Sequence, residues 1–444
     1  MLQVVSLELN EINFDFVQYY VADGRLPNFA RALARFELSE TVAEDLHPFL
    51  EPWIQWPTVY TGKDYAGHKV FRLGDIVETD HRQIWETLAD EGISVGAISP
   101  INGANRVPGA DFFVPDPWTV TPVTGDASLR ELSAIVTEAV NGNAHGAGGM
   151  ITLARRLTPF VWRYASVRSW REYSRILGYS VKYKWARAAF LDFFLSELFL
   201  KLRAQKGTQF ASLFLNAGAH IQHHHMFEAG AYKGDQSNPS WYSSAKDDGV
   251  DPLLFIYEVY DAILGEFMDL PNTRLFVTTG LSQVANPRTI YQYRFTDHAA
   301  SLTKLGVTGF DLAPRMSRDF LLSFPTREAA DAAKARMEQV TCAGQPMFTI
   351  EDRELSLFCQ IGYFGTSEAF AEVTVDGRKI DMRDEIVLVS IENGIHQTIG
   401  YHIDTAMPIG SAKGERPRIP LTSIFDRMRG AFAKEPARVA EFAA

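Results

Sequence analysis

A short apolar run that leads into a histidine-rich segment constrains the fold more than any other feature of this sequence. The run Phe210–Leu215 stops at Asn216, small residues follow, and four histidines then lie within six positions, at His220, His223, His224 and His225. This pattern is typical of a buried strand that opens through a loop into a helix. In an α/β sheet the carboxyl ends of the strands border the ligand crevice, so we expect a chemical centre at this edge.

The rest of the chain alternates between predicted strands and predicted helices. Strands are predicted at Gln3–Leu9, Phe36–Val42, Gly92–Ser99, Gln209–Leu215, Thr273–Thr279 and Glu385–Ile391, and helices at Phe14–Arg35, Gln83–Glu91, Pro252–Leu270 and Leu421–Phe432. The alternation predicts an α/β fold with a sheet sandwiched by helices. We expect an α/β core domain at 1–128, 207–308 and 385–444, a helical insertion at 129–206 and a small α+β subdomain at 309–384.

The predicted helical insertion is basic, whereas the chain as a whole is acidic. The chain has a formal net charge of −11, whereas Ile151–Lys206 carries twelve Lys or Arg against three Asp or Glu, mixed with Trp and Tyr. The acidic total argues against nucleic acid as a partner. The basic aromatic stretch predicts a cap over the site that selects an anionic small molecule or a lipid or sugar phosphate, or that touches a membrane peripherally. A solvated face with inward-packed aromatic anchors explains the same pattern.

The cellular compartment follows from what the sequence lacks. Its two cysteines, Cys342 and Cys359, have neither metal-ligand nor redox spacing, and the N-terminal residues do not form a signal peptide. No apolar run approaches the roughly 20 residues that a membrane span needs. These observations predict a cytoplasmic protein, with membrane association through 151–206 as an open alternative.

The histidines are candidate metal ligands. Helical positions three and four apart share a face, so His220 with His223 or His224 can present two imidazoles to one ion, and His396 can supply a third. Imidazole together with carboxylate suits zinc or manganese. The alternative is that several of these imidazoles form local hydrogen bonds or face solvent.

Carboxylates follow the first predicted strand and precede the next predicted helix. Glu11 stands at the end of Gln3–Leu9, and Glu51 opens the segment EPWIQWPTVYTG. A carboxylate at a strand end can be a ligand, a base or a nucleophile, and it can equally cap a helix or pair with a cation.

Taken together, these segments resemble the alkaline phosphatase superfamily, specifically its type I phosphodiesterase/nucleotide pyrophosphatase branch. ELNEINFDFV with GRLPNFARAL resembles its first strand and helix, and WPTVYTGKDYAGHKV its next element, with Trp56, Thr61, Gly62 and His68 in place. AHIQH, TTGLSQ and GIHQTIGYHI resemble its later metal-ligand elements. The resemblance implies an alkaline-phosphatase-like sheet and a hydrolase or transferase acting on a phosphorylated, phosphodiester or glycosyl substrate.

The sequence departs from the family at most of its functional positions. The family holds two metal ions with Asp and His residues around a Thr or Ser nucleophile. The corresponding positions here, in chain order, are Asn10, Glu11, Pro52, Ala219, Gly280 and Leu281. Only His223 and His396 remain as family ligands, so we expect at most one divalent ion, zinc or manganese, and no two-metal site.

Two interpretations remain open. In the first, the chain is an enzyme with a rebuilt site. Its predicted catalytic residues are Glu11, Glu51, His223 and His396; its predicted substrate-binding residues are Asn10, Gln55, Trp56 and Asn216; its predicted ligands for one ion are His220, His223 and His396. The carboxylates with His223 can also act without metal. In the second, the chain is a catalytically silent relative that binds an anionic ligand or a partner in the same crevice.

Overall fold

The computed structural model divides the chain into two compact units. The first comprises 1–285 and 394–444, and the second comprises 286–393. The residues described are 2–46, 49–141, 147–243, 245, 247–314, 318–409 and 416–433. The predicted subdomain 309–384 lies within the second unit, whose limits are wider.

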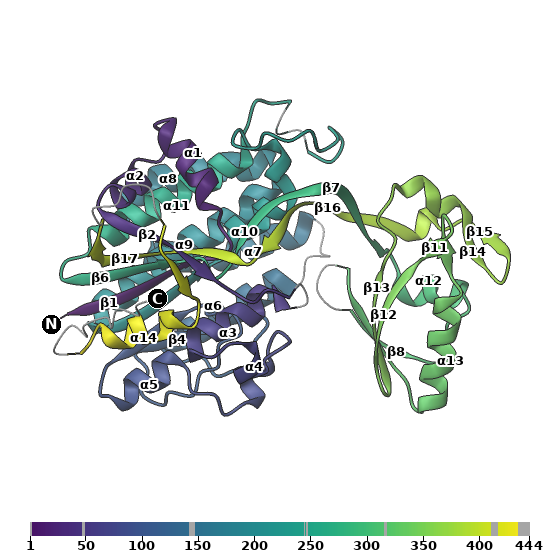
Figure 1. The fold of residues 1–444 in the computed structure, drawn as a ribbon, viewed down its shortest axis with the longest axis horizontal. Coiled ribbons are helices and arrows are strands. Elements are labelled where there is room, and N and C mark those ends of the chain that lie inside the picture. The colour runs from purple at the N-terminus through teal and green to yellow at the C-terminus, as the bar shows by residue number, and fades with distance from the viewer. Residues whose placement is uncertain are drawn as a thin grey trace, which may run out of the picture. The chain divides into compact units, whose positions relative to one another are not determined.

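The first unit is built on an eight-stranded sheet with strand order β18-β2-β17-β6-β1-β5-β3-β4 (Figure 1). The strands are β1 (Gln3–Leu9), β2 (Phe36–Val42), β3 (Val95–Ile98), β4 (Phe112–Val114), β5 (Phe210–Leu215), β6 (Thr273–Thr278), β17 (Ile399–Pro408) and β18 (Arg418–Pro420). β1 pairs in parallel with β5 and β6 at the centre, whereas β17 runs antiparallel to β2 and β6. The segment that precedes β17 therefore reaches the sheet edge where β1, β5 and β6 end.

Helices cover both faces of this sheet (Figure 1). One face packs with α1 (Phe14–Ala22), α2 (Pro27–Leu33), α6 (Ala127–Asn141), α7 (Ala147–Tyr164), α8 (Trp170–Lys182), α9 (Arg187–Lys206), α10 (Ala217–His225) and α11 (Pro252–Met268). The other packs with α3 (Pro52–Thr61), α5 (Ile84–Asp90) and α14 (Ser423–Gly430). The predicted α/β class, a sheet between helical layers, is confirmed.

The side chains of β1 alternate between these two layers, as the pleat of a strand requires. Val5, Leu7 and Leu9 enter the core on the α11 side, whereas Val4 packs on the α3 side. Glu8 lies on the α3 side as well, because its carboxylate accepts a hydrogen bond from Tyr60 of α3. A strand buried on both faces explains why almost every residue of Gln3–Leu9 is buried.

Helices α6, α7, α8 and α9 belong to the helical layer on the first face, and their role as a cap over the site stays a prediction. Buried residues of these helices, among them Tyr173 and Phe194, belong to the same apolar cluster as Leu7 of β1. Asp192 of α9 also accepts a hydrogen bond from the Ala217 amide at the start of α10. Within the segment 129–206, residues 142–146 lie outside the described residues, and α7 begins at Ala147.

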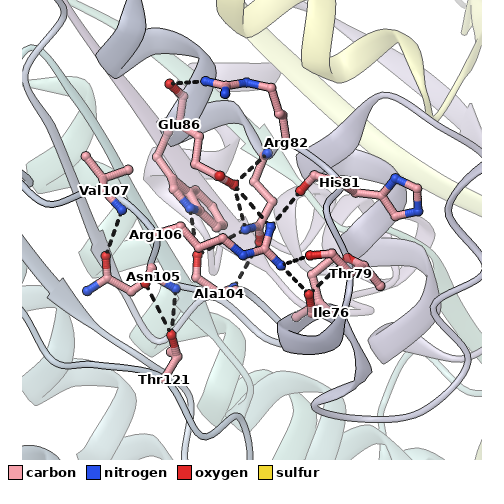
Figure 2. Close-up of polar contacts among 12 residues, drawn as sticks. Ile76, Thr79, His81, Arg82, Glu86, Ala104, Asn105, Arg106, Val107 and Thr121 are labelled. Carbon is pink, nitrogen blue, oxygen red and sulfur yellow. Dashed lines mark hydrogen bonds and ion pairs between the residues drawn. The ribbon is translucent and has the colours of Figure 1, made fainter.

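The irregular chain after α3 contains α4 (Tyr65–His68) and the 3₁₀ turn Asp75–Glu78, and Arg106 holds it together (Figure 2). The guanidinium of Arg106 donates to the backbone carbonyls of Ile76, Thr79 and His81. It also lies 3.7 Å from the Glu86 carboxylate of α5. A planar guanidinium with five donors can hydrogen-bond several backbone carbonyls at once and so join the turns of this segment.

The second unit has its own core, which includes Phe295, Leu322 and Phe370. Its two antiparallel four-stranded sheets have the strand orders β12-β13-β9-β8 and β11-β10-β14-β15. These strands are β8 (Asp311–Pro314), β9 (Phe320–Ser323), β10 (Thr341–Cys342), β11 (Gln345–Pro346), β12 (Phe348–Arg353), β13 (Ser356–Ile361), β14 (Val373–Val375) and β15 (Arg378–Ile380), and the helices are α12 (His298–Lys304) and α13 (Arg327–Glu338). The paired strands β7 (Ser282–Phe295) and β16 (Ile386–Gln397) carry the chain between the units. No helix within the described residues is both long and apolar enough to cross a membrane.

Candidate functional site

Three side chains from distant parts of the sequence converge at the carboxyl edge of the central strands. Glu11 follows β1, His223 lies on α10 and His396 lies near the end of β16. The Glu11 Oε2 atom is 3.2 Å from His223 Nε2 and 3.0 Å from His396 Nε2, and the two Nε2 atoms are 3.2 Å apart. These three residues form a group of potential metal ligands.

The backbone places Glu11 in an unusual conformation. Its φ is 61°, in the left-handed region that favours glycine, and its side chain is buried. The Glu11 amide donates to the Thr279 carbonyl, and the Glu11 carbonyl accepts from the side chain of Gln222 and the amide of Gln283. Neighbouring elements thus hold the residue in a conformation that costs on the order of 1 kcal/mol.

The Glu11 carboxylate is oriented by amide side chains as well. Asn10 Nδ2 donates to its Oε1 at 2.7 Å, and Gln283 Nε2 donates to its Oε2. Asn10 is fixed in turn, because it donates to Asn216 Oδ1 at 2.8 Å and accepts from the Trp56 indole at 2.7 Å. Such outer contacts hold a ligand in one orientation.

Hydrogen bonds on the far side of each imidazole determine which nitrogen faces Glu11. His223 Nδ1 lies 2.8 Å from the Gly394 carbonyl oxygen, which can only accept, so this nitrogen carries the proton. His396 Nδ1 faces Glu51 Oε2 at 3.5 Å, and the ring also hydrogen-bonds to the backbone of Leu50. When the rings are neutral, both Nε2 lone pairs therefore point toward the carboxylate.

The electrostatics of the site reflect this convergence. Burial favours a higher pKa for Glu11, but His396 and His223 hold the pKa of this carboxyl well below its usual value. Burial favours a lower pKa for His396, but Glu11 and Glu51 outweigh it and raise the pKa to about 9. A positive charge, either a proton or a metal ion, is thus favoured between the three groups.

The geometry of the three groups fits one metal ion. Ligand atoms about 2.0–2.1 Å from a tetrahedral or octahedral ion lie roughly 2.9–3.4 Å apart. The distances of 3.0, 3.2 and 3.2 Å fall within this range. The side chain of His223 is 32% exposed and that of Glu51 is 31% exposed, so a small ligand can reach the group.

The remaining predicted residues lie at different distances from this group. Glu51, at the start of α3, is beside His396, and Asn10 and Asn216 lie behind Glu11. Gln55 and Trp56 are fully buried; Gln55 donates to the Phe49 carbonyl. His220 is not in the group of three: its side chain is exposed, and its ring lies 4.7 Å from that of His224, measured between centroids.

Several of the positions that the sequence resemblance aligns with metal ligands or the nucleophile are occupied by residues with structural roles. Pro52 is the first residue of α3 and is buried. Gly280 has a φ of 72°, and the Trp56 indole would lie 3.0 Å from a Cβ atom there. The carbonyl of Ala219 accepts a hydrogen bond from Gln283.

Gln222, Gln283 and Gly394 belong to the site but carry no signal in the sequence. Gln222 lies among the histidines of AHIQHHH, and Gln283 lies in TTGLSQ; neither glutamine forms a recognisable motif of its own. The need for a glycine at 394 arises only from packing, because a Cβ atom there would lie 2.2 Å from Gln283 Oε1 and 3.0 Å from the Gln222 carbonyl oxygen.

Comparisons with known proteins identify similar folds but no close relative. No family model matches the chain, and no curated protein does. Among solved structures, similar ones include phosphonoacetate hydrolase from Sinorhizobium meliloti in complex with phosphonoacetate (11% identity, 96% of this chain, 95% of that chain, TM-score 0.44). Others are murine ectonucleotide pyrophosphatase/phosphodiesterase 5 (11% identity, 96% and 94% coverage, TM-score 0.42) and alkaline phosphatase from the Antarctic bacterium TAB5 (11% identity, 96% and 96% coverage, TM-score 0.37). With TM-scores below 0.5, the activity of this chain is argued from its own residues.

Proposed function

We propose that Glu11, His223 and His396 hold a single divalent metal ion, and that the chain is a divergent enzyme of the alkaline phosphatase superfamily type. The observation that carries this proposal is the triangle of ligand atoms with sides of 3.0, 3.2 and 3.2 Å. The sequence resemblance supports the superfamily, since the residues that align with its ligand elements meet at one edge of the sheet.

The reaction class that fits this site best is hydrolysis or transfer at a phosphorylated, phosphodiester or glycosyl substrate. A divalent ion, when bound, supplies Lewis-acid charge for an oxygen of the substrate. Glu11 and the two imidazoles would hold the ion, and the hydrogen bond to the Leu50 backbone together with the Glu51 carboxylate 3.5 Å away favours a proton on His396 Nδ1. The Glu51 side chain is 31% exposed beside the group, so its carboxylate could accept a proton from an attacking hydroxyl or water.

Metal analysis of the purified chain tests the first part of the proposal. We expect about one equivalent of zinc or manganese per chain in the wild type. His223→Ala and His396→Ala should lose it, whereas His220→Ala should retain it, because His220 is an exposed histidine of the same helix outside the group. Two equivalents in the wild type, or metal retained in His223→Ala, would contradict a single ion at this place.

A substrate screen tests the second part. Phosphomonoesters, phosphodiesters and sugar phosphates would be assayed with metal-loaded wild type, His223→Ala and His220→Ala. We expect turnover that His223→Ala lowers by at least about a hundredfold and His220→Ala leaves unchanged. If His223→Ala turns over substrate as fast as the wild type, the group of Glu11, His223 and His396 does not take part in the reaction.

The second candidate function is binding without turnover. It is favoured by Pro52 at the first position of α3, where the family carries a hydroxyl nucleophile. In that case the metal-loaded wild type shows no turnover in the screen but binds an anionic compound, and His223→Ala abolishes the binding.

A further inference from the structure

The α7–α8 side of the first unit exposes apolar and basic side chains together. Trp162 is 71% exposed, Val167 83%, Leu177 48% and Val181 86%. Two exposed arginines, Arg168 and Arg171, lie among them in the sequence. We call this surface the basic–apolar face and define it by six residues: Trp162, Val167, Arg168, Arg171, Leu177 and Val181.

Helix α8 has a buried side and an exposed side, and the apolar α8 residues of the basic–apolar face lie on the exposed side. Tyr173 and Ile176 are buried against the core on one side of the helix. Arg171, Leu177 and Val181 lie on the exposed arc of the helix, and Leu177 and Val181 are one turn apart. Large apolar side chains on the outer side of a helix contribute nothing to the core, and a group of them marks an interaction surface.

The face begins where α7 meets α8. The Trp162 ring of α7 lies 5.1 Å from the Trp170 ring at the start of α8, which brings the two helices together at this end. The 3₁₀ turn Val167–Ser169 connects them. From there the face continues along α8 to Val181, a distance of roughly 20 Å at about 1.5 Å per helical residue.

The charge of this region is opposite to that of the chain. Between 155 and 187 the only acidic residue is Glu172, and the chain as a whole has a formal net charge of −11. Glu172 is occupied by an ion pair with Arg175. Within the described residues, no ion pair joins Arg168 or Arg171 to a carboxylate; Arg168 lines a cavity with Glu172, Glu197 and Glu266, and both arginines are exposed to an anionic partner.

We propose that the basic–apolar face binds the surface of an anionic lipid bilayer. Exposed Trp and aliphatic side chains partition into the interface, and nearby arginines bind lipid phosphates. Each cation near an anionic leaflet contributes about 1 kcal/mol. Because the rest of the molecule is acidic and repelled by the same surface, the face also determines the orientation of the bound protein.

Sedimentation of the full chain with lipid vesicles tests this proposal. Vesicles of phosphatidylcholine are compared with vesicles of phosphatidylcholine and phosphatidylglycerol in equal parts. We expect binding to the anionic vesicles alone, weakened by salt. Arg168→Glu combined with Arg171→Glu should weaken it by at least about tenfold, and Trp162→Ser should weaken it several-fold.

The matched control is Arg378→Glu combined with Lys379→Glu, which changes the net charge equally at exposed positions of β15. This control should retain wild-type binding, and both the control and the Arg168 and Arg171 variant should keep the wild-type melting temperature because these residues are exposed. The proposal is overturned if the wild type binds neither vesicle, if it binds both equally, or if the control loses as much binding as the Arg168 and Arg171 variant.

Discussion

At the scale of single residues, the strained backbone of Glu11, together with its buried charge, supports the proposal that this position serves a function. A residue with φ of 61° is less stable than glycine there, and a buried carboxylate adds a cost of desolvation. Both costs persist because Gln222 and Gln283 hold the backbone and because His223 and His396 compensate the charge. Strain of this kind concentrates at functional sites.

The strain at Glu11 predicts an order of stability between two variants. Glu11→Gly and Glu11→Ala both remove the carboxylate, but only glycine adopts a positive φ without steric cost. We expect the glycine variant to be more stable by about 1 kcal/mol in metal-free urea unfolding. An alanine variant that is equally stable or more stable would show that the backbone at this position is not strained.

A second residue-scale prediction concerns Gly394. In Gly394→Ala the new methyl group would collide with Gln283 Oε1 and shift the carbonyl that orients His223. We expect metal affinity to fall by about 10–100-fold while the overall fold is retained. Isothermal titration with zinc measures this, and Gly109→Ala, where a Cβ atom meets nothing within 4 Å, is the control. If Gly394→Ala binds zinc as tightly as the wild type, the Gly394 carbonyl does not determine how His223 is oriented for metal binding.

At the scale of elements, polar contacts between β1 and α3 position the site. Trp56 and Tyr60, one helical turn apart on α3, donate to Asn10 and Glu8 of the first strand segment at 2.7 Å each. Since the two pairs are spaced alike on helix and strand, they fix the register of α3 against β1. This register places Glu51, at the start of α3, next to His396.

The buried carboxyl of Glu8 makes the stability of this contact depend on pH. Burial raises its pKa to about 7, although hydrogen bonds from Tyr60 and Ser6 oppose the rise. Because the pKa of Glu8 is higher in the folded state than in the unfolded state, raising the pH favours the unfolded state, in which the carboxyl ionises more easily. The free energy of unfolding is therefore highest below about pH 4.5 and falls as the pH rises toward 7. Glu8→Gln should abolish this loss and be more stable than wild type at pH 8 by about 1–3 kcal/mol.

Urea unfolding at pH 5 and pH 8 measures the effect for wild type and Glu8→Gln. Glu131→Gln, which changes an exposed carboxylate of α6, controls for the loss of one charge. If the free energies of unfolding of wild type and Glu8→Gln differ equally at both pH values, the titration of Glu8 has no part in the stability.

At the scale of the whole molecule, the proposed ligands come from three segments far apart in the chain. Glu11, His223 and His396 belong to different elements, all within the first unit. An ion that binds all three connects these segments and favours the folded state over the unfolded one. The stabilisation is about 2.7 kcal/mol when free metal is a hundredfold above its Kd.

Removal of metal should therefore destabilise the first unit. We expect EDTA to lower the melting temperature of the wild type and added zinc or manganese to restore it. In His223→Ala the melting temperature should not respond to chelator, whereas in His220→Ala it should respond as in the wild type. A melting temperature of the wild type that is insensitive to chelator would contradict a metal bound by these elements.

The second unit should fold by itself. It has a separate apolar core, and its two ends are adjacent, because the Asn286 side chain donates to Glu392 at 3.0 Å. We expect a fragment of residues 286–393 to show a dispersed amide spectrum and cooperative unfolding. Leu322→Ala should cost it about 2–4 kcal/mol, since Leu322 is fully buried. A fragment that remains unfolded would show that this unit depends on the rest of the chain.

Local patterns in the sequence were sufficient to predict several elements of the first unit. The strand predictions Gln3–Leu9 and Phe36–Val42 coincide with β1 and β2, and the predicted helix Pro252–Leu270 contains α11. Each depends on the periodicity of neighbouring residues or on a compact apolar run, which is information that a short window contains. The α/β class follows from the order of such windows.

Only the tertiary structure determined which polar residues meet. His220 and His223 share a helix, yet the imidazole of His223 lies with Glu11 and His396, whereas that of His220 is exposed beside His224. The partner of His223 is selected by the antiparallel direction of β17, which brings His396 to the edge where β1 and β5 end. Contacts between residues 173 or more positions apart depend on strand order and direction, and no local pattern encodes these.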